Sequence, residues 1–134
     1  MRPARLAPLC LALLLLAGCA GGNTADECAQ EPAEVTPQYV EAWPDNDFTA
    51  ALPEPEAGEV EYVCDLSGCG RFEIVMKDMP DGGAEAYIET LKRAGFAEKA
   101  SAENDVSGGV LLQKDGVSLS IAWSGTGMNV LIKK

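Results

Sequence analysis

An apolar run near the N-terminus decides how much of this 134-residue chain is available to fold. Arg2 and Arg5 precede the run, and residues 9–16 are uncharged and mostly leucine. A short positive segment followed by an apolar core and small residues is typical of an export signal, which the mature protein lacks. The core is shorter than the roughly 20 apolar residues that a membrane-spanning helix needs. We therefore expect residues 1–18 to be a signal peptide.

The run ends in Leu16-Ala17-Gly18-Cys19, which resembles the lipobox of bacterial lipoproteins. The resemblance implies cleavage before Cys19, a diacylglyceryl thioether on its sulfur, and an acyl chain such as palmitate on the new N-terminus. Several chains matter, because one acyl chain holds a protein at a membrane only weakly and reversibly. We expect a protein anchored through Cys19 at the extracytoplasmic face of the cell membrane, or in an outer membrane if the source is Gram-negative.

The mature chain divides into three parts by composition. Residues 19–38 are small, acidic and without apolar periodicity, so they cannot bury enough surface to offset the entropy of ordering, and we expect a disordered tether. Residues 39–58 also lack periodicity but contain large apolar side chains such as Trp43 and Phe48. Side chains of that size usually pack against something, which predicts an extended lead-in lying across the domain. The folded domain then spans residues 59–134.

The charge of the chain is strongly and unevenly acidic. Residues 20–70 contain twelve Asp or Glu and no Lys or Arg, whereas residues 71–134 contain nine acids and eight bases. The mature charge is therefore about −13, from twenty-one acids against eight bases. Nucleic acid is a poor partner for such a chain, because phosphate binding needs a basic surface. An acidic tether is also repelled by an anionic membrane.

Alternating apolar residues predict two strands at the start of the domain. Val60, Tyr62 and Cys64 alternate with polar or smaller residues. Phe72, Ile74 and Met76 do the same after a short turn. An amphipathic helix follows, because five apolar residues recur at helical spacing: Ala84, Tyr87, Ile88, Leu91 and Ala94. Gly95 is suited to end it.

The pattern over the rest of the chain predicts a series of strands. The expected strands are residues 96–102, 107–114, 117–124 and 128–134. Asp115-Gly116 is a strong two-residue hairpin signal between two of them. The economical packing is one amphipathic helix covering one face of the sheet. We therefore predict an α+β fold: a largely antiparallel sheet of about five strands, in a ββαββββ-like order, with the helix on one face.

Three cysteines remain after Cys19, namely Cys28, Cys64 and Cys69. The four-residue turn between Cys64 and Cys69 could bring their sulfurs within bridging distance, and export permits disulfides. A structural Cys64–Cys69 disulfide is the favoured interpretation. A bond from Cys28 to either of them, or three reduced thiols, are the alternatives. A metal site is not expected, because the chain has no histidine and only three thiolates, where a structural zinc usually takes four ligands.

Three short motifs occur in the order Trp43-Pro44, Leu52-Pro53-Glu54-Pro55 and Tyr87-x-x-x-Leu91-Lys92-x-x-Gly95-Phe96. Together they resemble an uncharacterised lipoprotein domain of Gram-positive-type bacteria, a domain of unknown function. The resemblance covers about residues 43–134. It implies a membrane-anchored lipoprotein with this fold, and it implies no active-site residues.

Catalytic motifs are absent from the sequence. Without histidine no Ser-His or Cys-His pair can form, and no Gly-x-Ser-x-Gly or Ser-x-x-Lys motif occurs. We expect neither enzymatic activity nor a cofactor nor a bound metal.

Two surfaces are candidates for binding a ligand or a partner. One is the region of Trp43, whose aromatic face beside acidic residues suits sugars or cations. Trp123 has the same potential but is expected in the core. The other is a flat polar sheet face carrying Ser118, Ser120 and Ser124.

The expected function is a non-catalytic binding module of the cell envelope whose ligand is unknown, with an envelope protein as one candidate partner. One alternative is a solute- or peptide-binding accessory subunit of an envelope enzyme or transporter, and another is a carboxylate-based hydrolase.

Overall fold

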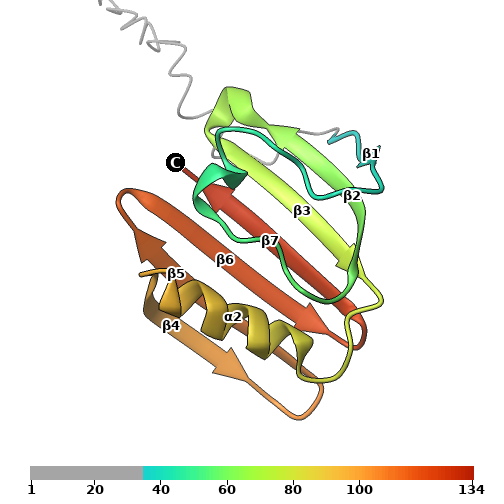
Figure 1. Ribbon diagram of the computed structural model, residues 1–134, viewed down its shortest axis with the longest axis vertical. Coiled ribbons are helices and arrows are strands. Elements are labelled where there is room, and N and C mark those ends of the chain that lie inside the picture. Colours follow the sequence, from blue (N-terminus) through green and yellow to red (C-terminus); the bar gives the residue numbers. More distant parts are fainter. Residues whose placement is uncertain (1–34) are drawn as a thin grey trace, which may run out of the picture.

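The computed structural model describes residues 35–134, so the predicted signal peptide, Cys19 and most of the predicted tether lie outside the described residues. Over this range the chain forms a seven-stranded antiparallel sheet with one α-helix (Figure 1). The strands are β1 (Gln38–Tyr39), β2 (Glu59–Leu66), β3 (Arg71–Lys77), β4 (Ala97–Glu103), β5 (Ser107–Lys114), β6 (Val117–Ser124) and β7 (Gly127–Lys133). The helices are α2 (Gly83–Arg93) and two short 3-10 turns, η1 (Thr49–Ala51) and η2 (Ser67–Cys69).

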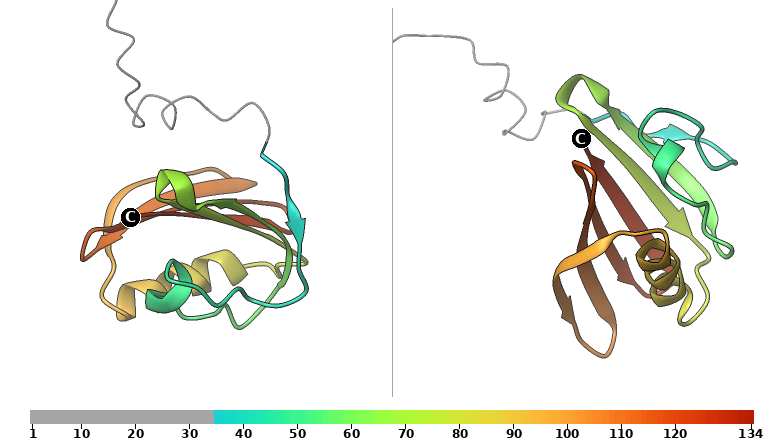
Figure 2. Two further views of the ribbon diagram at one scale, coloured as in Figure 1. Left: turned by 90° about the horizontal axis from the view of Figure 1, so that it is seen from above. Right: turned by 60° about the vertical axis from the view of Figure 1, so that its left-hand side comes forward.

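The sheet order is β1-β2-β3-β7-β6-β5-β4, and every neighbouring pair is antiparallel. Helix α2 carries the chain from β3 across one face of the sheet to the far edge, where β4 begins. Three consecutive hairpins then return it to β3. Figure 2 shows that α2 and the loop of the lead-in lie on the same side of the curved sheet. The hydrophobic core therefore lies between the sheet and these two segments.

The prediction of a largely antiparallel sheet with one covering helix is confirmed, but about five strands was too few. The two residues of β1 pair with β2. They belong to a proline-rich and acidic stretch without an alternating apolar pattern, so the sequence does not predict this strand. The strand expected over residues 96–102 is present as β4, although its seven residues are all exposed and show no alternation, so β1 is the strand that the predicted order lacks.

The core follows the predicted alternation. Six buried residues of β3 and β7 face the helix: Phe72, Ile74, Met76, Met128, Val130 and Ile132. The helix contributes the predicted residues Ala84, Tyr87, Ile88 and Leu91, all buried. Gly95 has φ 105° and ends the helix as expected, with its N–H donating to the Lys92 carbonyl. Within residues 35–134 no helix has the length and apolarity to cross a membrane.

Strand β2 differs from the predicted alternation. Its pairing with β3 shifts between Val60 and Tyr62, which marks a β-bulge. A bulge inserts one extra residue, so the residues after it change faces. Val60 pairs with the core residue Met76, whereas Cys64 pairs with Glu73, which alternates with core residues and faces away from the helix. Val60 and Cys64 therefore lie on opposite faces of the sheet.

The bonding state of Cys64 and Cys69 differs from the prediction. Cys64 is a buried free thiol, whereas Cys69 is disulfide-bonded, so the predicted Cys64–Cys69 disulfide is wrong. The ladder between β2 and β3 continues past Cys64 to the pair Leu66–Arg71, and Cys69 lies beyond its end in η2. Burial, and to a lesser extent the charge of Glu73, raises the pKa of the Cys64 thiol. No other cysteine occurs between residues 35 and 134, so the partner of Cys69 is outside the described range.

Candidate functional site

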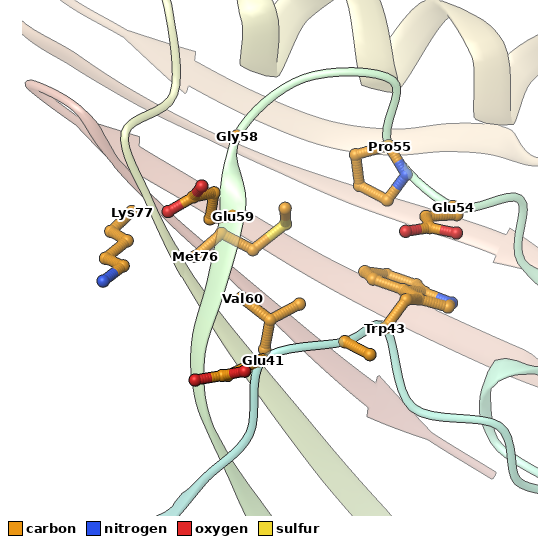
Figure 3. A pocket seen from close by; sticks show the side chains of 10 residues that line it. Glu41, Trp43, Glu54, Pro55, Gly58, Glu59, Val60, Met76 and Lys77 are labelled. Atoms are coloured by element: carbon orange, nitrogen blue, oxygen red, sulfur yellow. The ribbon is translucent and has the colours of Figure 1, made fainter.

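Trp43 forms one wall of a pocket of about 470 Å³ at the end of the sheet where β2 begins and β3 ends (Figure 3). Three carboxylates line it, from Glu41, Glu54 and Glu59, and Lys77 is the one basic side chain among its described lining residues. The indole is half-buried and meets the Tyr87 ring edge-on, with ring centroids 6.3 Å apart. Trp43 therefore both packs against the core and faces an acidic cavity, which we call the Trp43 pocket.

The loop after Trp43 is held by its own side chains. The Asn46 side-chain oxygen accepts hydrogen bonds from the backbone N–H groups of Phe48 and Thr49, at 2.8 and 3.1 Å. The buried Thr49 hydroxyl donates to the Pro44 carbonyl at 2.7 Å. These bonds close the chain into a compact turn directly after Trp43. The indole is thus positioned by local polar contacts as well as by Tyr87.

A second pocket, of about 780 Å³, opens at the same end of the sheet. It lies between the start of α2, the β4–β5 turn and the β6–β7 turn, and Trp123 lines it. Four of its lining residues are acidic, and no lysine or arginine is among the described ones: Asp81, Glu85, Glu103 and Asp105. We call this the Trp123 pocket. It has the same composition as the first, an indole surrounded by carboxylates.

Trp123 is only half-buried, although it belongs to the core-facing row with Leu119 and Ile121, where it was expected. The reason lies on the neighbouring strand, where Gly108 pairs with Trp123. A Cβ at Gly108 would lie 2.2 Å from the indole Cζ2, so the ring occupies the space that any other side chain would need. The missing side chain lets the indole lie over β5 and reach the pocket.

The serines of β6 lie on the other side of the sheet from Trp43. Ser120 pairs with Leu131 and Leu111, outside the core rows, and Ser120 and Ser124 are exposed, whereas Ser118 is partly buried. The structure therefore does not bring Trp43 and the predicted serine face together. It keeps the serine face as a second surface, which neither α2 nor the lead-in covers (Figure 2).

Carboxylate clustering at this end was not predicted. The acids of the two pockets come from the lead-in, β2, α2 and the β4–β5 turn, and only the strand register brings these segments together. No local spacing in the sequence could have shown it. Within residues 35–134 no group of three or more acidic or thiol side chains is arranged to hold a metal ion.

Comparison with known proteins finds no matching family model, no similar curated protein and no similar solved structure. The resemblance to an uncharacterised lipoprotein domain therefore stays a prediction.

Proposed function

We propose that this protein is a bacterial lipoprotein, anchored through acyl chains on Cys19 to the extracytoplasmic face of a cell membrane. Its domain acts as a non-catalytic binding module, and the Trp43 and Trp123 pockets receive a positively charged segment of an envelope protein. The anchor rests on the lipobox-like Leu16-Ala17-Gly18-Cys19. The ligand class rests on one observation: two neighbouring pockets each combine an indole with several carboxylates, and together they contain one lysine.

Each contact between a positive charge and the pockets contributes little binding free energy by itself, so binding depends on the sum of several contacts. A cation over an exposed indole gains about 0.5–1 kcal/mol. An exposed ion pair contributes a similar amount and is weakened by salt. Seven carboxylates around two indoles can therefore select a segment carrying several positive charges, while a single lysine side chain would bind weakly.

If Cys19 is lipidated, labelled palmitate should be incorporated into the wild-type chain but not into Cys19→Ala. The Cys19→Ala variant should also be lost from the membrane fraction. Cys28→Ala is the matched control, because it removes a cysteine nine residues further on and should keep the label. Membrane association of Cys19→Ala with undiminished labelling would contradict the lipoprotein assignment.

If this site binds cationic segments, Glu103→Gln/Asp105→Asn should weaken binding of an oligolysine peptide about 5- to 30-fold, since two exposed charge contacts of about 0.5–1 kcal/mol each are lost. Isothermal titration at low salt measures the affinity. Glu89→Gln/Asp115→Asn changes the charge equally, away from both pockets, and should alter the affinity less than about 2-fold. Equal losses in both variants would mean that the peptide senses only overall charge, and the proposed site would be wrong.

A further inference from the structure

The net charge of the domain is concentrated at the end of the sheet that carries the two pockets. Residues 35–134 contain seventeen acids and eight bases, a balance of −9. The seven acids of the pockets, together with Glu56, Glu61 and Asp78 beside them, make ten, and Lys77 is the one base among them. This acidic end thus carries a net charge of −9, and the charges of the remaining seven acids and seven bases of residues 35–134 sum to zero. The domain is electrically polarised along its strands.

The opposite end, which we call the hairpin end, contains η2, the β5–β6 turn and Lys134. Four basic side chains lie at or next to it: Arg71, Lys114, Lys133 and Lys134. Lys114 donates to the Ala94 carbonyl at 2.6 Å, so the end of α2 is also here. Charges separated by more than a Debye length, about 8 Å in physiological salt, act separately. An anionic surface therefore repels the acidic end and leaves the hairpin end nearly unaffected.

The chain enters the domain from the hairpin end. Strand β1 is antiparallel to β2, with Gln38 opposite Val63 and Tyr39 opposite Tyr62. Residues preceding Gln38 therefore approach from the direction of Leu66 and η2, where Cys69 lies. Cys28 stands ten residues before Gln38, a reach of about 33 Å, whereas Cys69 is six residues from Val63, a separation of at most about 20 Å because η2 is not extended.

Cys28 is the cysteine that can pair with Cys69 in a mature lipoprotein, because Cys10 would leave with the signal peptide and Cys19 would carry the thioether. Cys64 is excluded because it is a free thiol. Forming the bond releases two protons and transfers two electrons to a disulfide-exchange oxidant of the envelope. Only the eight residues 20–27 would then separate the lipidated Cys19 from a covalent attachment at the hairpin end.

We propose that the domain sits on an anionic membrane with its hairpin end toward the lipid headgroups and its acidic end, with both pockets, facing away. The inference rests on the lipid anchor proposed above, and the domain's own charge and chain direction supply the orientation. The negative charge of the tether does not oppose this orientation, because the attachment through Cys69 would shorten the free part of the tether. The partner of the pockets would accordingly be met on the side away from the membrane.

Two serines on the same strand and the same face give a matched pair of reporters. Ser118 lies near the hairpin end of β6 and Ser124 at the acidic end, six residues or about 20 Å apart. Ser118→Cys and Ser124→Cys can be labelled with a fluorescent maleimide in the lipidated full-length chain, because Cys64 is buried and Cys69 is bonded. Vesicles of phosphatidylglycerol and phosphatidylcholine carrying headgroup nitroxides then report how close each label is to the lipid.

We expect the label at position 118 to be quenched at least 3-fold more than the label at 124, and this ratio to fall in pure phosphatidylcholine vesicles. Equal or reversed quenching in anionic vesicles would overturn the orientation while leaving the anchor intact. Failure of the lipidated chain to bind vesicles at all would overturn the anchor and the orientation together. Non-reducing peptide mapping should show Cys28 linked to Cys69; Cys28 linked elsewhere, or reduced, would remove the covalent part of the proposal.

Discussion

Replacing Gly108 by alanine is expected to lower the free energy of unfolding by about 2–3 kcal/mol, at the upper part of the range for overpacked cores. The new Cβ would lie 2.2 Å from Cζ2 of Trp123 and 2.6 Å from Cε2, so the rigid indole itself must move. The ring packs against the core and lines the Trp123 pocket, and its displacement should change both stability and tryptophan emission. Urea unfolding followed by fluorescence measures the two effects together.

Gly109→Ala is the matched control on the next residue of the same strand. Its Cβ would meet only the Ile121 carbonyl oxygen at 3.7 Å, an ordinary contact, and Gly109 has no positive φ. We expect a change within about 0.5 kcal/mol, as for substitutions that create neither a cavity nor a clash. If the two variants lose equal stability, glycine is needed in β5 for a backbone reason, and the account of Trp123 given above is wrong.

The sequence predicted the elements whose periodicity is produced by burial. Leu91 and Ile121 lie where their spacing placed them, because a helix or strand with one buried face needs that spacing. The Asp115-Gly116 turn was equally predictable: both residues have positive φ, 49° and 80°, as a tight hairpin of this type requires. These features depend on residues close together in the chain.

The features that sequence reasoning missed depend on distant residues. The bulge that turns Cys64 away from the core is set by how β2 fits β3, and the two residues of β1 form a strand only because β2 offers an edge. The acidic end is assembled by the sheet order from segments between Glu41 and Asp105. The half-buried position of Trp123 needs a glycine fifteen residues earlier. Each was accessible only once the register was known.

Tyr87→Phe is expected to cost about 1–3 kcal/mol near neutral pH, because it removes a buried hydrogen bond between the helix and the lead-in. The Tyr87 hydroxyl donates to the Pro53 carbonyl at 2.9 Å, and its ring supports Trp43. Phenylalanine fills the same space but leaves the Pro53 carbonyl without this donor. The variant should therefore also loosen the Trp43 pocket, which thermal unfolding and oligolysine binding can measure separately.

The stability difference between wild type and Tyr87→Phe should become smaller as the pH rises above 10. Burial raises the pKa of Tyr87 well above its ordinary value of 10, so above pH 10 the unfolded chain releases this proton while the folded chain keeps it. Stability linked to Tyr87 is complete below pH 10 and declines as the pH rises, by about 1.4 kcal/mol at pH 11. The gap between wild type and Tyr87→Phe should shrink by that amount between pH 8 and pH 11.

Tyr62→Phe is the control for this pH dependence. Tyr62 also has a raised pKa, mainly through desolvation, but it lies on the face of the sheet away from the helix and is far less buried than Tyr87. Its gap to wild type should therefore change much less over the same pH range. A gap for Tyr87→Phe that stays constant from pH 8 to pH 11 would mean that the hydroxyl ionises freely in the folded protein. The hydroxyl would then be open to water, and the contact that fixes the lead-in beside the Trp43 pocket would be absent.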